Sequence, residues 1–234
     1  MRAGDREKGL KAMFSFEAWW QILTTKLPVF FQGVGTTVEL ALCTAIFGTL
    51  LGIVVALLRM SRVKLLKVLA GAYIEFLRGT PLLVQVLIVF YGLPQMGVKL
   101  PRMTAGTVAL VINSAAYMAE IVRSGIQAID GGQTEASRSL GMNGAQTMIY
   151  IILPQAIKNI LPAIGNEFVS IIKESSILYT IGIYELTYQA NKLASTNFRY
   201  LETLTISALI YFVLTFTASR LLGMLERRMR RGDR

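Results

Sequence analysis

A run of 19 residues from Leu40 to Leu58 contains no charged side chain. As an α-helix this run would be roughly 28 Å long, which is enough to cross the hydrocarbon layer of a bilayer. Similar apolar stretches recur along the chain, which is 53% hydrophobic and only 16% charged, with the charges clustered between the stretches. A soluble globule is not expected from such a pattern. The chain is therefore predicted to be an all-α protein that crosses the membrane several times.

Five transmembrane helices are expected, at residues 30–58, 79–98, 103–129, from about 156 onward, and 201–222. The sequence Arg-Gly-Thr-Pro at 78–81 would break a helix, so residues 65–77 are predicted to form a separate interfacial helix. The chain then divides into a tail and interfacial helix (1–28), a transmembrane domain (29–225) and a basic C-terminal tail (226–234). A loop with a short helix is expected at 179–200.

The basic residues indicate which partners the chain has and how it is oriented. Lys and Arg number 24 against 14 Asp and Glu, and many of them flank apolar runs, at 59–67 and 220–234. Anionic lipid headgroups are therefore the expected partner, and nucleic acid is not. Basic residues are in modest excess on the side of 59–67 and the C-terminus. This excess predicts a multi-pass membrane protein with a cytoplasmic C-terminus and an external N-terminus.

Several kinds of chemistry are excluded or not expected. The sequence has no histidine, so histidine bases and histidine-ligated zinc are excluded, and its single cysteine, Cys43, allows no intrachain disulfide. No GxxxxGK[ST] phosphate loop and no nucleophile with a nearby base occur. We therefore expect no catalytic residue, no metal site and no cofactor in this chain. If ATP drives the protein, a partner must hydrolyse it.

The longest polar connection, residues 131–154, is predicted to form two short helices. Thr134 can cap a helix that begins at Glu135, and Gly141 can end it in a left-handed conformation. Asn143 can start a second helix, which Pro154 ends. Its apolar face would consist of Ala145, Met148, Ile149 and Ile152. Such a pair is too short to cross a bilayer and too apolar on one side to stay solvated, so it needs a docking partner.

Polar side chains within the predicted spans are the candidate binding residues. Glu167 and Glu174 lie two helical turns apart, with Ser170 between them, and carboxylates in membranes usually face a polar cavity or a partner. The alternative is that Lys173 neutralises Glu174 and that Glu167 serves packing. The other candidates are Gln85 on the second span and a polar stripe on the third span that consists of Asn113, Ser114, Tyr117 and Glu120. Polar residues also hold membrane helices together, which is the alternative reading of this stripe.

These helices could enclose a small zwitterion. Its ammonium group would bind the carboxylates, and its carboxylate would bind backbone amides of the broken helix near Gly79 and Pro81. Glu75 and Arg78 are three residues apart and are expected to pair with each other.

Segment 135–154 resembles the EAA loop of permease subunits of ATP-binding-cassette (ABC) importers, with Ser137 where alanine is more common. YIEFLRGTPLLVQ at 73–85, INSAAYMAEIVRSGIQAI at 112–129, LPQAIKNILPAIGNEF at 153–168 and IKESSILYTIG at 172–182 are similar to the polar amino-acid permeases of glutamine and arginine uptake systems. The resemblance implies the type I importer fold, with five transmembrane helices and a cytoplasmic coupling helix. It also implies a prokaryotic inner-membrane location.

The resemblance further implies partners and roles. The partners are a cytoplasmic ATPase dimer that carries ATP and Mg²⁺, a second permease copy, as a homodimer or a related pair, and an extracytoplasmic solute-binding protein. Residues implied to dock on the ATPase are Glu135, Ala136, Gly141, Leu153 and Pro154. The amino-acid pocket is carried over to Asn113, Ser114, Glu167 and Glu174, although many relatives have Asp-Thr at 174–175.

The expected function is alternating-access import of polar amino acids such as glutamine or arginine, driven by partner ATPases. An ion-coupled secondary amino-acid transporter is the first alternative, since membrane carboxylates permit it. A structural scaffold is the second. It would gain nothing from polar stripes on three successive spans. A membrane enzyme is disfavoured because no catalytic set is present.

Overall fold

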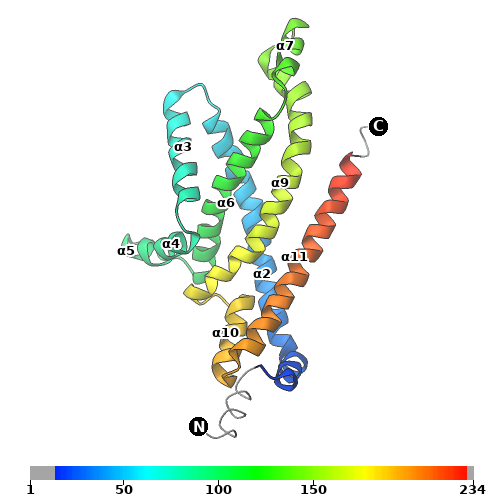
Figure 1. Cartoon of the computed structure of the whole chain (residues 1–234). Helices are drawn as coiled ribbons and strands as arrows, with labels where there is room; N and C mark the ends of the chain where they lie inside the picture. The colour runs from blue at the N-terminus through cyan, green and yellow to red at the C-terminus, as the bar shows by residue number, and fades with distance from the viewer. Residues whose placement is uncertain (1–13, 231–234) are drawn as a thin grey trace, which may run out of the picture.

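The computed structural model of this protein describes residues 14–230, and within that range it contains helices and no strand. Figure 1 shows an elongated bundle with α7 (Gly131–Ser139) and the C-terminal end of α11 (Tyr200–Arg230) at one end. The start of α2 (Phe16–Arg59) and α10 (Leu186–Asn197) lie at the other end. The charged N-terminal run at 1–13 and the last four residues of the expected basic tail lie outside the described residues.

Four helices in the described range are long and apolar enough to cross a membrane, and a bent pair raises the number of crossings to five. The first is α2, which runs without a break from Phe16 through Pro28 to Arg59. The segment expected to be a separate interfacial helix before residue 29 is therefore continuous with this helix from Phe16 onward. Trp19 and Leu23 pack on a buried cluster that α2 shares with α10 and α11, and this packing supports the helix on both sides of the proline.

The second crossing is broken in the middle. α3 (Lys64–Gly79) and the segment Leu82–Gln95 meet at an angle of 107°. That segment consists of α4 (Leu82–Leu87), the π-helical turn η1 (Ile88–Gly92) and α5 (Leu93–Gln95). The break at 78–81 is confirmed, and α3 forms the first part of the bent pair. It packs along α2 and α6, through Ala70 and Ile74, because its buried face is small and apolar.

The centre of the bundle is the contact between α2 and α6 (Arg102–Gln127), which corresponds to the expected third span. Glycines allow the two backbones to approach closely. A Cβ atom added at Gly52 would lie 2.4 Å from Cβ of Met118, and one added at Gly48 would lie 2.9 Å from Oγ of Ser114. A larger residue at Gly52 would push the helices apart, because the backbone carbonyl of Ala115 is also only 2.9 Å from the added Cβ, whereas at Gly48 the Ser114 side chain would have to move.

The fourth crossing begins earlier than expected, at Gly144, and continues to Ile181. It comprises α8 (Gly144–Gln146), the π-helical turn η2 (Thr147–Ile152), α9 (Leu153–Glu174) and a 3-10 turn, η3 (Ser175–Ile181). The prediction that Pro154 ends a helix is wrong. A proline ring clashes with the carbonyl four residues earlier in an α-helix, and the wider π-helical turn before Pro154 relieves that clash.

A loop and the short helix α10 lead to α11, as expected. Glu185 caps α10, and its fully buried carboxylate accepts hydrogen bonds from the backbone of Thr187 (2.8 Å) and Tyr188 (2.6 Å) and from Tyr211 Oη (2.7 Å). Burial raises the pKa of Glu185 above its usual range, and these hydrogen bonds oppose the rise. The network joins α10 to α11.

Candidate functional site

The first candidate site is the projection formed by α7 and the start of the fourth crossing. α7 begins at Gly131 and not at Glu135, because Asp130 rather than Thr134 is its N-cap and accepts a hydrogen bond from the backbone of Gly132 (2.6 Å). Gly141 has a φ of +86°, and it ends the helix in the left-handed conformation that the sequence predicted.

The second helix of the projection starts as predicted, at Asn143. The side chain of Asn143 accepts from the backbone of Gln146 (3.0 Å), and the side chain of Gln146 accepts from the backbone of Asn143 (2.8 Å). The expected apolar face is only partly buried. Ile152 is buried, whereas Met148 and Ile149 are exposed, and the buried residue near the start is Thr147.

The projection leaves large apolar side chains in the open. Leu140 is 84% exposed and Tyr150 is 68% exposed, and Figure 1 shows that α7 lies beyond the end of the bundle. All five residues that the sequence assigned to ATPase docking are exposed: Glu135, Ala136, Gly141, Leu153 and Pro154. Leu140 lies in the connection before the fourth crossing, and an exposed apolar side chain outside the spans favours association with another protein, so this tip of the projection is suited to a protein partner.

The second candidate site lies inside the bundle, where the second crossing breaks. Pro81 has no N–H, so the carbonyl of Leu77 lacks the partner that a continuous helix would supply. Gln85 Nε2 donates to that carbonyl (2.8 Å) and to the carbonyl of Thr80 (3.2 Å). Asn113 Nδ2 donates to Gln85 Oε1 (3.0 Å). Two of the predicted binding residues thus hold the break against α6, and their contact with a solute stays a prediction.

Oppositely charged groups lie within electrostatic range of each other beside this break. Ser114 Oγ donates to Glu167 Oε1 (3.5 Å), which brings α6 and α9 together. Arg78, at the end of α3, lies over the ring of Tyr117, with Cζ 5.3 Å from the ring centroid. Arg78 is also close enough to Glu167 for their charges to interact. Glu167 and Tyr117 are half-buried and Arg78 is exposed, so these groups remain accessible.

Two further predicted residues lie one and two turns along α9 from Glu167. Ser170 and Glu174 are half-buried, and the charges of Glu167 and Glu174 lie close enough to interact. Lys173 is exposed and lies within electrostatic range of the Glu174 carboxylate, and whether it neutralises that carboxylate stays a prediction. The structure therefore brings Ser114, Tyr117, Glu167 and Glu174 toward one region of the bundle.

Three ionic side chains differ from the expectations. Glu75 pairs with Arg59 (3.6 Å) and not with Arg78, because α3 folds back along the end of α2. Arg78 was thus missed as a site residue, and its position next to the helix break was the available signal. Glu120, at the end of the polar stripe, binds Arg123 on the next turn of α6 (2.9 Å), and the charge of Arg78 also acts on it.

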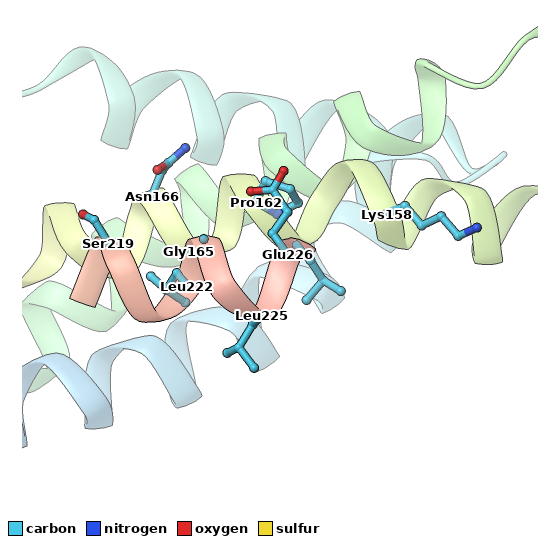
Figure 2. A pocket seen from close by; sticks show the side chains of 10 residues that line it. Lys158, Pro162, Gly165, Asn166, Ser219, Leu222, Leu225 and Glu226 are labelled. Atoms are coloured by element: carbon cyan, nitrogen blue, oxygen red, sulfur yellow. The ribbon is translucent and has the colours of Figure 1, made fainter. Parts of the chain in front are cut away.

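A separate cavity of about 280 Å³ lies between α9 and α11. Figure 2 shows Asn166 and Ser219 toward one end of it and Lys158 toward the other, with Glu226 and Pro162 between them. Gly165 lets Leu222 approach α9 at its floor. None of the predicted binding residues lines this cavity, and most of its wall is apolar. It is a groove between two crossings and not the charged site.

Comparison with known proteins identifies the architecture. The model of the family described as "Binding-protein-dependent transport system inner membrane component" matches residues 48–231. The arginine transport system permease protein ArtQ of Bacillus subtilis (strain 168) is 40% identical over 209 residues, which cover 89% of this chain and 95% of ArtQ. The probable amino-acid permease protein YxeN of the same organism is 39% identical over 213 residues, which cover 90% of this chain and 95% of YxeN.

Solved structures agree with this result. The crystal structure of an amino acid ABC transporter with histidines matches with a TM-score of 0.87 and 50% identity, and the match covers 92% of this chain and 99% of that one. The fold is that of a type I ABC importer permease, a multi-pass protein of the inner membrane. The chain belongs to the family of inner-membrane components of binding-protein-dependent transport systems, and it is a translocation subunit and not an enzyme.

Proposed function

We propose that this chain is the permease subunit of an ATP-driven importer of polar amino acids, and that cationic side chains such as that of arginine are favoured. The observation that carries the substrate class is the nearness of opposite charges at the helix break. Arg78, over the ring of Tyr117, lies within electrostatic range of Glu167, and Glu174 adds a second carboxylate on the same helix. A zwitterion fits between one guanidinium and one carboxylate, and the additional carboxylate suits a second positive charge. The amino-acid systems of the relatives support the same substrate class.

ATP and Mg²⁺ are carried by a partner ATPase in this proposal, since the sequence has no phosphate loop. The α7 projection is its docking surface, and closure of the ATPases moves it. A solute-binding protein delivers the amino acid at the opposite end. A second permease copy completes the site, because Arg78 is exposed and both carboxylates are only half-buried in a single chain. The comparisons offer no support for the ion-coupled alternative.

The test of the substrate site compares uptake of arginine and glutamine by cells that express Glu167→Gln and Glu174→Gln variants. Arginine uptake should fall more than glutamine uptake, because a cation loses an attraction that a neutral side chain never had. Glu39→Gln is the matched control. Glu39 is an exposed carboxylate on α2 that lines a different hollow, beside Arg102. Equal losses of arginine and glutamine uptake would show that the two carboxylates do not distinguish a cationic side chain from a neutral one.

The test of the docking surface uses Leu140→Asp and Gly141→Trp in the purified complex. Each variant should lower amino-acid transport per ATP hydrolysed, because the first places a charge on the exposed apolar tip and the second strains a left-handed backbone position. Gly144→Ala is the control, since Gly144 is helical and an added Cβ there meets nothing within 4 Å. Wild-type transport per ATP in both variants would exclude this surface as the coupling site.

A further inference from the structure

The cavity between α9 and α11 has no part in the proposed transport of amino acids. Its volume is about 280 Å³, and apolar side chains form most of its wall: Leu161, Pro162, Leu222 and Leu225. Gly165 and Gly223 also line it and add no side chain. A Cβ added at Gly223 would meet nothing within 4 Å, so this glycine borders open space and not a packed neighbour. The cavity is therefore a groove with room for an apolar chain.

The groove has about the length of one leaflet of a bilayer. Figure 2 shows Lys158 toward one end and Asn166 toward the other, eight residues apart on α9 or roughly 12 Å along the helix. Glu167, next to Asn166, accepts a hydrogen bond from Ser114 at the middle of α6, so this end lies near the middle of the membrane. One leaflet of the hydrocarbon core is about 15 Å thick. The groove thus extends from the middle of the membrane to its surface on the α7 side.

Basic side chains lie at the surface end of the groove. Lys158 lines it, and Arg227 folds back along α11, where its Nε donates to the carbonyl of Gly223, another lining residue (3.2 Å). Lys158 and Arg227 are exposed. Glu226 also lines this end, so two positive charges stand against one negative charge there. Because basic pockets between membrane helices bind acidic lipid headgroups, this end is suited to an anionic headgroup.

The charge and the apolar wall together select one kind of occupant. A free phosphate would use the basic end and leave the apolar groove unfilled, whereas a zwitterionic lipid would fill the groove and gain little from the excess of positive charge. An anionic phospholipid satisfies both, since its acyl chain is apolar and its phosphate is negative. The basic connection at 59–67 predicts that this side is cytoplasmic, where anionic lipids give the membrane surface a negative potential.

We propose that the groove between α9 and α11 binds an anionic phospholipid, such as phosphatidylglycerol, from the leaflet on the α7 side. One acyl chain lies along the groove beside Leu161 and Leu222, and the phosphate is bound by Lys158 and Arg227. The lipid fills space that the two crossings leave between them. The lipid site is separate from the proposed solute site, because none of the predicted binding residues lines the groove.

The test of the headgroup uses native mass spectrometry of the purified transporter complex, titrated with dioleoylphosphatidylglycerol or dioleoylphosphatidylcholine. The wild type should bind phosphatidylglycerol more tightly. Lys158→Gln and Arg227→Gln should each weaken that binding by about fivefold, the contribution of one basic residue near an anionic lipid surface, and leave phosphatidylcholine binding unchanged. Lys158→Arg keeps the charge and should retain the binding. Arg228→Gln is the matched control, because Arg228 is exposed and lies about 200° around α11 from Glu226.

A second variant tests the groove without changing the charge. Gly223→Leu places a side chain in the groove at a position where an added Cβ meets nothing, and it should weaken the binding of phosphatidylglycerol. Gly35→Leu is the matched control, since a Cβ at Gly35 also meets nothing within 4 Å and Gly35 lies on α2, outside the groove. The melting temperature of each variant shows whether the protein is folded.

Several results would overturn the proposal. Equal affinity of the wild type for the two lipids would exclude selection by charge. Displacement of phosphatidylglycerol by inorganic phosphate, or unchanged binding in folded Gly223→Leu, would show an anion site in which the groove has no part. Cross-linking of Gly223→Cys between two copies of the chain, in a Cys43→Ala background, would show that a second permease copy covers the groove.

Discussion

The amides of Gln85 and Asn113 show how a polar residue in a membrane helix can serve the backbone. Gln85 supplies a donor to the carbonyl of Leu77, which Pro81 leaves without its helical partner, and Asn113 holds Gln85 in place (3.0 Å). An unpaired polar group buried in protein costs about 1–3 kcal/mol. The side chains at the break are therefore constrained by the fold before any solute is considered.

Replacing Gln85 with Leu should lower the thermal stability of the detergent-solubilised protein, because the carbonyls of Leu77 and Thr80 lose their donor. Asn113→Leu should do the same, and a double-mutant cycle should give a coupling of roughly 0.6 kcal/mol, as is typical of hydrogen bonds between membrane helices. Thr107→Val is the control, since its hydroxyl bonds only within α6. Strictly additive losses would show that the two amides do not interact.

The carboxyl of Glu185 should make stability depend on pH. Burial raises its pKa in the folded protein, so the folded state binds this proton more tightly than the unfolded state does. The stabilising contribution of protonated Glu185 is fully present below the pKa that this group has in the unfolded state. It is lost as the pH rises through the pKa of the group in the folded state. Relative to Glu185→Gln, the wild type should therefore gain stability on acidification, by at most about 1.4 kcal/mol per pH unit.

Thermal unfolding of both proteins between neutral and mildly acidic pH measures the difference. Glu17→Gln, at an exposed position on α2, controls for the loss of one carboxyl. Parallel stability curves for the wild type and Glu185→Gln would show that Glu185 does not titrate differently in the folded state.

At the scale of elements, hydropathy and turn chemistry predicted most of the helices, including the break at 78–81 and the left-handed end at Gly141. Prolines were the main source of error. Pro28 lies inside α2, and Pro154 follows a π-helical turn, so neither ends a helix. The same arrangement occurs at Pro94. The π-helical turn η1 is followed by the sequence Leu-Pro-Gln at 93–95, and η2 is followed by the same sequence at 153–155. Sequence rules for α-helices do not predict that a proline can follow a π-helical turn without ending the helix, because that turn is formed by hydrogen bonds between residues five apart.

The contact between α2 and α6 predicts which glycine the fold requires. Gly52→Leu should lower thermal stability by about 1–3 kcal/mol or prevent folding, because its Cβ would lie 2.4 Å from that of Met118 and overpacking carries this cost. Gly35→Leu is the control on the same helix, since a Cβ there meets nothing within 4 Å. Protein yield and melting temperature measure both variants. Equal effects would mean that close packing at Gly52 is not required.

At the scale of the whole molecule, the number of crossings could be predicted because apolar length is a local property. The sites could be predicted only as residue types, since their geometry depends on contacts between distant segments. Arg59 pairs with Glu75 across the α2–α3 connection, and Arg78 lies over the ring of Tyr117 within electrostatic range of Glu167. Local spacing favoured a Glu75–Arg78 pair, because it contains no information about how α3 folds back.

The orientation of the molecule in the membrane is the last prediction. Arg59, Arg62, Lys64 and Lys67 lie at the connection between α2 and α3, toward the same end of the bundle as α7, and basic connections stay on the cytoplasmic side. Since Cys43 is the only cysteine, Cys43→Ala provides a background for single-cysteine labelling. Ser139→Cys, near the end of α7, and Ser195→Cys, on α10, then report on opposite ends of the bundle.

A membrane-impermeant maleimide should label Ser195→Cys in intact spheroplasts, and it should label Ser139→Cys only after the membrane is opened. Both serines are exposed, so burial does not explain a difference between them. The cysteine-free background should remain unlabelled in both conditions. The reverse pattern would place α7 outside the cell. It would then be out of reach of any cytoplasmic ATPase, and the coupling role of the α7 projection and its tip at Leu140 would fail with it.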